Sequence, residues 1–126
     1  MGRADKKFKA IRSISALLSH DPTIQSYVGD KIYALIAPPD VEGDFIALRR
    51  DGYRRQDTKM GVSLQQSIFY VFAISDTYDR GLDMADAIYD VLEGYHKEYD
   101  LRVRLEDYTE EYVDKKFIQV LRFNLE

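Results

Sequence analysis

The strongest pattern of apolar positions runs through residues 65–74 and continues as a helical pattern to residue 92. The alternating positions of this stretch are Gln66, Ile68, Tyr70, Phe72 and Ile74 in one set and Ser67, Phe69, Val71 and Ala73 in the other. Because successive side chains of a strand point to opposite faces, the pattern predicts a strand that is covered on both faces. A small domain rarely has helices for both faces, so the cover of the second face becomes the main functional question.

Helical spacing of apolar residues is found both before and after this strand. Residues 5–19 have the spacing of an amphipathic helix. Asp21 and Pro22 predict the N-cap and first residue of a short helix that Gly29 ends. After the strand, Asp76 or Thr77 is expected to cap a helix that extends to about residue 95. The apolar face of that helix is predicted to contain Leu82, Ala85, Ile88, Tyr89, Leu92 and Tyr95.

The remaining apolar segments have strand character. Residues 31–36 and 45–50 precede the central strand, and residues 99–106 and 117–125 alternate between apolar and polar side chains. We predict the last two as an antiparallel hairpin joined by a charged turn at 107–116. The expected element order is α-α-β-β-β-α-β-β. Residues 1–126 would then form one two-layer α+β domain, with a mainly antiparallel sheet packed on helices.

Two groups of opposite charge flank the central strand. Residues 51–63 are polar and aperiodic, and we interpret them as a long hairpin arm or a mobile loop. In and before this segment lie Arg49, Arg50, Tyr53, Arg54, Arg55 and Lys59. The helix that follows has one narrow acidic stripe of Asp79, Asp83, Asp86, Asp90 and Glu93. Two interpretations are open. Each group is simply a solvated surface, or the acidic stripe of one copy contacts the basic residues of another.

The composition argues against several kinds of chemistry. The chain has no cysteine, which excludes disulfides, thiolate nucleophiles and cysteine zinc sites. Its two histidines, His20 and His96, lie at the ends of predicted helices, where we interpret them as capping or exposed residues. The glycines form no phosphate-binding fingerprint, and no apolar run reaches the ~20 residues of a membrane span. We therefore expect no enzyme activity, metal, cofactor or membrane partner.

Charge and aromatic content leave two classes of binding protein. The net charge of −4 disfavours a general nucleic-acid binder. The ten tyrosines suit either a half-buried sheet or a protein–protein interface. Self-association is the favoured interpretation. The alternative is a small sheet-faced nucleic-acid-binding module that uses Tyr53, Phe69 and the arginines.

Two stretches are similar to a known family. They are YVGDKIYALIAP (27–38) and FYVFAISDTYDRGLDMADAIYDVL (69–92), in which an apolar strand ends in a Ser-Asp turn before a helix with small residues. In element order and length, residues 10–125 resemble the tail-completion proteins of long-tailed bacteriophages, called tail-terminator or head–tail joining proteins. The sequence departs from that pattern at residues 44–55, which lack a proline-containing aromatic start and are unusually basic.

The resemblance implies a prophage-encoded, non-enzymatic protein of the virion tail that assembles in the bacterial host cytoplasm. Family members form a ring, typically a hexamer, that contacts tail-tube and head-connector proteins. The nucleic acid expected there is DNA that passes through the ring. We hypothesise that the basic arm meets the acidic stripe across the subunit boundary, and that the second face of the central strand, with Phe69 and Val71, also contributes to the interface.

Overall fold

The computed structural model describes residues 3–35, 37–57 and 63–125, with side chains described for 10–35, 37–50 and 67–125. Its elements are α1 (Arg3–Ser19), α2 (Pro22–Val28), β1 (Ile32–Ala34), β2 (Phe45–Asp57), β3 (Ser63–Ser75), α3 (Tyr78–Leu92), β4 (Gly94–His96), β5 (Leu101–Val113) and β6 (Lys116–Leu125). The α+β class follows from these elements. The predicted order lacked β4, which follows α3 directly.

The strands form one mixed sheet in the order β1-β2-β3-β6-β5-β4. β1 pairs in parallel with β2, and the other neighbours pair antiparallel. The prediction of a mainly antiparallel sheet is corrected here. The parallel pair arises from the path of the segment between β1 and β2, which the spacing of apolar residues does not predict. That segment returns the chain to the edge where β1 began, so that Ile46 pairs with Ile32 and both strands run the same way.

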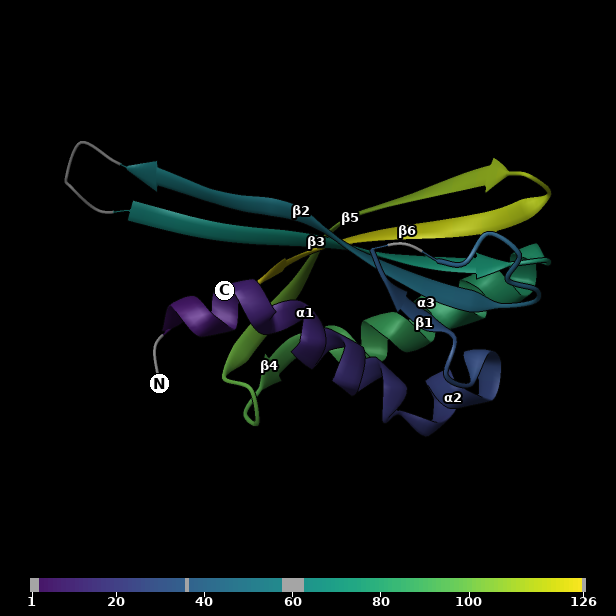
Figure 1. The fold of residues 1–126 in the computed structure, drawn as a ribbon, viewed down its shortest axis with the longest axis horizontal. Helices are drawn as coiled ribbons and strands as arrows, with labels where there is room; N and C mark the ends of the chain where they lie inside the picture. Colours follow the sequence, from purple (N-terminus) through teal and green to yellow (C-terminus); the bar gives the residue numbers. More distant parts are fainter. Residues whose placement is uncertain (1–2, 36, 58–62, 126) are drawn as a thin grey trace.

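β2 and β3 form a long hairpin that extends beyond the helices (Figure 1). The sequence predicted that β2 ends at Arg50, but the strand continues to Asp57. The register shifts between Arg50 and Gly52, so one extra residue forms a bulge there and pairing then resumes. Apolar alternation could not reveal this extension, because strand pairing depends on the partner strand and does not require an apolar face. Lys59 and the rest of residues 58–62 lie outside the described residues.

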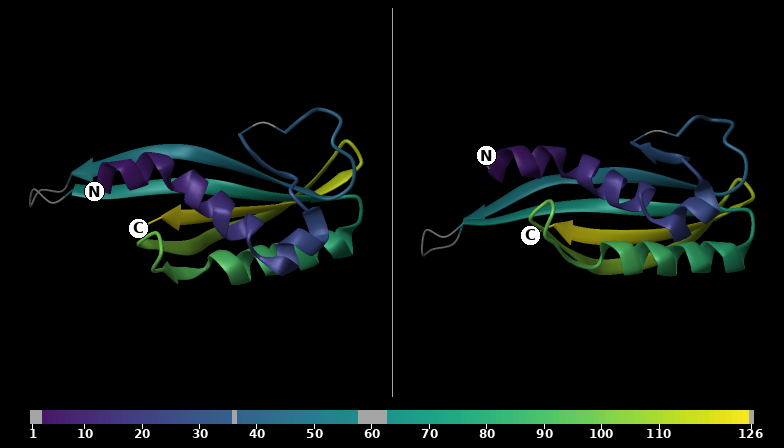
Figure 2. Two further views of the ribbon diagram at one scale, coloured as in Figure 1. Left: turned by 60° about the horizontal axis from the view of Figure 1, so that its bottom comes forward. Right: turned by 90° about the horizontal axis from the view of Figure 1, so that it is seen from below.

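The helices α1, α2 and α3 lie on the same side of the sheet (Figure 2). The odd-numbered residues of β3 face them, and Phe69, Val71 and Ala73 are buried in the core. The ring of Phe69 stacks on Phe123 of β6, with 5.3 Å between the ring centroids. α1 contributes Ile14 to the same core. One face of the predicted two-faced strand is thus covered by helices.

The helix starts agree with the cap signals in the sequence. Asp21 caps α2, and its Oδ2 accepts a hydrogen bond from Ile24 N at 3.0 Å. Thr77 caps α3, and its hydroxyl oxygen accepts a hydrogen bond from Arg80 N. Gly29 is the C-cap of α2, and its φ of 62° is a positive value that glycine adopts readily. Local capping chemistry therefore predicted these boundaries correctly.

The C-terminal end of α3 differs from the prediction. The helix ends at Leu92, and Gly94, with a φ of 115°, turns the chain into β4. Tyr89 and Tyr95 are 41% and 53% exposed, so neither belongs to the buried face to which the sequence assigned them. The buried residues of α3 are Gly81, Met84, Ala85, Ala87, Ile88 and Leu92.

The C-terminal hairpin also has longer strands than predicted. β5 continues to Val113, and the turn consists of Asp114 and Lys115, with φ values of 53° and 66°. Two successive residues with positive φ are typical of a tight hairpin turn. The predicted ten-residue turn at 107–116 is therefore corrected to a two-residue loop. Its charged side chains misled the prediction because this part of β5 is exposed.

The glycines of α2 and α3 give a matched test of the backbone. A Cβ on Gly81 would meet Gln119 at 3.5 Å, an ordinary contact, whereas Gly29 needs its positive φ. We expect Gly81→Ala to raise the free energy of unfolding by up to about 1 kcal/mol, because glycine is a poor helix former. Gly29→Ala should lower it by about 1 kcal/mol or more. Urea titrations followed by circular dichroism measure both, and a clear loss of stability in Gly81→Ala would contradict the described packing of α3 on β6.

Candidate interface surfaces

The basic arm is the part of the β2–β3 hairpin that carries Arg49, Arg50, Tyr53, Arg54 and Arg55. Arg49 is exposed, and its guanidinium lies over the ring of Tyr70, 5.6 Å from the centroid. Arg50 is half-buried, and this burial lowers the pKa of its guanidinium. The backbone of residues 53–55 pairs with residues 65–67 of β3. Of the two interpretations of residues 51–63, the long hairpin arm is the one that the structure supports, and the basic residues up to Arg55 lie along its strand β2.

The acidic stripe lies on the exposed surface of α3. Asp79, Asp83, Asp86 and Asp90 are all exposed, as their helical spacing predicted. Glu93, the fifth predicted member, is instead half-buried at the C-cap of α3, where its Oε1 accepts a hydrogen bond from Leu105 N at 2.8 Å. The stripe has different neighbours along its length. Asp86 contributes to the raised pKa of Tyr108, and Asp83 to the raised pKa of Arg80. One edge of the stripe therefore adjoins β5, and the other adjoins Arg80.

A group of aromatic residues that the sequence did not single out lies beside Asp86. We call Tyr78, Tyr108, Glu110, Tyr112 and Phe117 the tyrosine cluster. Glu110 Oε2 accepts a hydrogen bond from the Tyr78 hydroxyl at 2.7 Å, and the Tyr108 hydroxyl lies 3.1 Å from the same oxygen. The Phe117 ring centroid is 5.7 Å from that of Tyr78 and 4.7 Å from that of Tyr112. Side chains from α3, β5 and β6 meet in this cluster.

The sequence does contain one indication of the cluster, because Tyr108, Glu110 and Tyr112 occupy alternate positions. Residues two apart on a strand share a face, but the sequence analysis had assigned these positions to a turn. Burial, then the hydrogen bond with Glu110, raises the pKa of Tyr108 to about 12. The hydrogen bond with Glu110 is also the main cause of the raised pKa of Tyr78. The negative charge of Glu110 therefore keeps both phenols protonated to higher pH.

An ion pair fixes the start of α3 against the sheet. The carboxylate of Asp44, just before β2, is buried and pairs with Arg80 Nε of α3. The hydroxyl of Ser75, at the end of β3, donates a hydrogen bond to Asp44 Oδ1 at 2.7 Å. The guanidinium of Arg80 also lies over the ring of Tyr27 of α2, 5.2 Å from its centroid. The hydrogen bond and charge of Asp44 raise the pKa of Arg80.

The second face of the sheet carries the even-numbered residues of β3. Tyr70 and Phe72 are half-buried, and their rings stack with centroids 5.9 Å apart. Neighbouring positions on this face are Ala47 of β2 and Val120 of β6, which both pair with Phe72. Among the described residues, no helix lies over this face (Figures 1 and 2). It is the open face of the sheet.

Two residues proposed for the interface lie on the other side. Phe69 and Val71 are 1% and 0% exposed and face the helices, so neither is available on the open face. The sequence showed that both alternating sets are apolar, but it did not show which set faces the helices. Tyr70 and Phe72 are the half-buried side chains that β3 presents on the open face.

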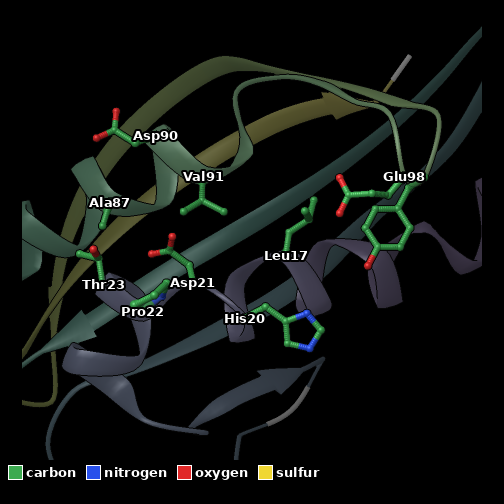
Figure 3. Close-up of a pocket in the computed structure, with 10 residues that line it drawn as sticks. Leu17, His20, Asp21, Pro22, Thr23, Ala87, Asp90, Val91 and Glu98 are labelled. Carbon is green, nitrogen blue, oxygen red and sulfur yellow. The ribbon is translucent and has the colours of Figure 1, made fainter.

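A pocket of about 410 Å³ lies among the α1–α2 junction, α3 and the segment before β5 (Figure 3). It is lined by Leu17, His20, Asp21, Pro22, Thr23, Ala87, Asp90, Val91, Glu98 and Tyr99. In the part of the chain that the structure describes, no group of three or more histidine or acidic residues is arranged to hold a metal. His20 is exposed at the pocket, and His96 Nε2 lies 2.6 Å from Leu92 O at the end of α3. The interpretation of the histidines as exposed or capping residues is confirmed.

Comparison with known proteins supports the fold. The sequence matches no protein-family model and no curated protein. Among solved structures, the fold is similar to a chain of the "Virion of native gene transfer agent (GTA) particle", with a TM-score of 0.70 and 18% sequence identity over 89% of each chain. At that identity the likeness establishes the shared fold. A search of the described helices for a segment able to span a membrane finds none.

The raised pKa of Tyr108 gives a pH-dependent contribution to stability. An unfolded tyrosine releases its proton near pH 10, whereas folded Tyr108 retains it to about pH 12. Since the folded state then binds more protons, this contribution is complete below pH ~10 and is lost as the pH rises to ~12. We expect the stability of Tyr108→Phe to fall less steeply over this range in urea titrations. Glu110→Gln should lower the pKa of Tyr108, measured by phenolate absorbance. Equal slopes for wild type and Tyr108→Phe would contradict the assignment.

Proposed function

We propose that this chain is a structural protein of a phage-like virion. The observation that carries the proposal is its fold, which resembles that of a gene transfer agent virion chain over 89% of both lengths. The similarity of residues 27–38 and 69–92 to phage tail-completion proteins supports the finer assignment. We infer that the protein acts as a tail terminator or head–tail joining protein. It has no enzymatic role in this proposal.

The proposed mode of action is self-assembly into a ring, with a hexamer as the expected size. A ring requires heterologous contacts, in which one surface of a subunit meets a different surface of the next. The basic arm and the acidic stripe are surfaces of opposite charge on different elements. The open face, with Tyr70 and Phe72, adds apolar area that a neighbour can cover. These features fit a ring subunit better than an isolated monomer.

The position in the virion follows from the same assignment. The ring would lie at the head-proximal end of the tail tube, where it contacts tail-tube and head-connector proteins. DNA would pass through its centre, and assembly would take place in the cytoplasm of the bacterial host. In this role specificity comes from shape and charge at subunit contacts, which direct orientation and register more than they add affinity.

Charge reversal tests the contact between arm and stripe. Arg54→Glu with Arg55→Glu should raise the protein concentration needed for assembly by roughly tenfold or more, because like charges then face each other. Adding Asp83→Lys and Asp86→Lys should restore part of the assembly. Light scattering across a concentration series at low salt measures the mass, where charge contacts are least screened.

A matched control makes the same change in net charge at another part of the surface. Lys97→Glu with Arg102→Glu alters exposed residues near β4 and should leave assembly close to that of wild type. The contact is wrong if the arm variant assembles as well as this control. If wild type stays monomeric at every concentration, both alone and with tail-tube protein, the ring proposal itself fails.

A further inference from the structure

We propose that the basic arm of one copy binds the tyrosine cluster of the next, on the surface where α3 meets β5. The inference rests on the proposed self-assembly and names its contact surface. The acidic stripe then forms only one border of the site. Its other parts come from β5 and β6, which sequence spacing along the helix could not include.

Exposure first indicates a binding surface at the tyrosine cluster. Tyr78, Tyr108 and Tyr112 are 42%, 40% and 61% exposed. Exposed aromatic side chains that gather in one place are typical of protein–protein contacts, because tyrosine combines apolar area with a polar hydroxyl. The ring contacts of Phe117 hold Tyr78 and Tyr112 in place before a partner binds. The cluster is therefore a pre-ordered surface.

The charge of the cluster indicates what kind of partner it takes. Within the described part of the chain, the hydrogen-bond partners of Glu110 are the neutral hydroxyl groups of Tyr78 and Tyr108, and the Tyr108 hydroxyl shares its proton between Glu110 and Gln119 Oε1 of β6. The Glu110 carboxylate is thus held in position but keeps its negative charge. Asp86 adds a second carboxylate whose charge also acts on Tyr108. A carboxylate flanked by aromatic rings suits a guanidinium group, which bonds to the carboxylate and stacks on the rings. Arg54 and Arg55 of the arm have this chemistry, and they directly follow Tyr53 in the sequence.

The fold places these two surfaces at opposite ends of the molecule. The β2–β3 hairpin points toward one end of the long axis, and the β5–β6 turn lies at the other (Figure 1). The arm of a chain therefore points away from the tyrosine cluster of the same chain. A contact between them joins one copy to the next, head to tail, which is the heterologous geometry that a ring requires.

Crosslinking can test this contact directly, because the natural chain has no cysteine. One variant carries Arg54→Cys in the arm, and a second carries Val113→Cys, at the residue after Tyr112 on the opposite face of β5, so that the probe does not replace a side chain of the tyrosine cluster. Mixed and treated with a short bismaleimide, they should form the mixed dimer roughly tenfold or more faster than a control pair of Arg54→Cys with Lys97→Cys, because a bound contact raises the local concentration. Adding Glu110→Gln and Tyr112→Ala to the Val113→Cys chain should remove this advantage. Circular dichroism verifies that each variant folds.

The outcomes separate this inference from the proposed function. If wild type forms rings by light scattering but the arm–cluster pair crosslinks no faster than the control pair, the arm binds elsewhere and the inference is overturned. An advantage that survives Glu110→Gln and Tyr112→Ala overturns it as well. A fast crosslink in assemblies that remain open chains supports the contact and overturns the ring. Failure of both assembly and crosslinking overturns both.

Discussion

The structure depends on β3, a central strand that pairs with β2 along one edge and with β6 along the other. β2 pairs with one edge over residues 45–57, and β6 pairs with the other over residues 117–125. Without the β3–β6 pairing, the sheet would divide into β1-β2-β3 and β6-β5-β4. The pairing of β3 with β6 therefore joins the β2–β3 hairpin to the β5–β6 hairpin. The odd-numbered residues of β3 pack against the apolar side chains of the helices, and the even-numbered residues lie on the open face.

The buried carboxylate of Asp44 fixes the helices relative to this strand. It joins the start of β2, the end of β3 and the start of α3 through Ser75 and Arg80. A buried carboxylate is unfavourable unless its hydrogen bonds are made, so this set of partners specifies one position of α3 over the sheet. The tyrosine cluster follows from that position, because Tyr78 at the first turn of α3 must reach Glu110 on β5. Core packing and surface chemistry are thus connected through one polar contact.

Much of the fold could be predicted from local signals. Caps at Asp21 and Thr77, the central strand and the exposed acidic stripe depend on neighbouring residues or on simple periodicity, and the structure has them where expected. The extension of β2 and β5, the parallel β1 and the short β4 depend on partner strands far along the chain. Charged residues give a strand no apolar alternation, so the sequence predicts a turn for the second half of β5 and leaves a hairpin arm and a mobile loop as alternatives for residues 51–63. Register and pairing are properties of two segments and cannot be read from one.

The same limit applies to the candidate interface. Each partner surface was visible in part, as arginines before β3 and aspartates on α3, but Phe69 and Val71 were placed on the wrong side because alternation does not say which set faces the helices. The tyrosine cluster was missed because its members come from α3, β5 and β6, which the sheet brings together.

The proposed contact connects these features to the geometry of assembly. The arm belongs to the β2–β3 hairpin and the cluster lies on the β5–β6 hairpin, and the pairing of β3 with β6 holds the two hairpins at a fixed angle. Neighbouring strands twist with a constant hand, so this angle is a property of the sheet and is hard to alter. In a head-to-tail assembly the angle between a subunit's two contact surfaces sets the rotation from one copy to the next. That rotation decides whether a chain of copies closes into a ring or continues as an open helix. In the proposed assembly, the central strand would therefore influence the number of subunits as well as support the core of each one.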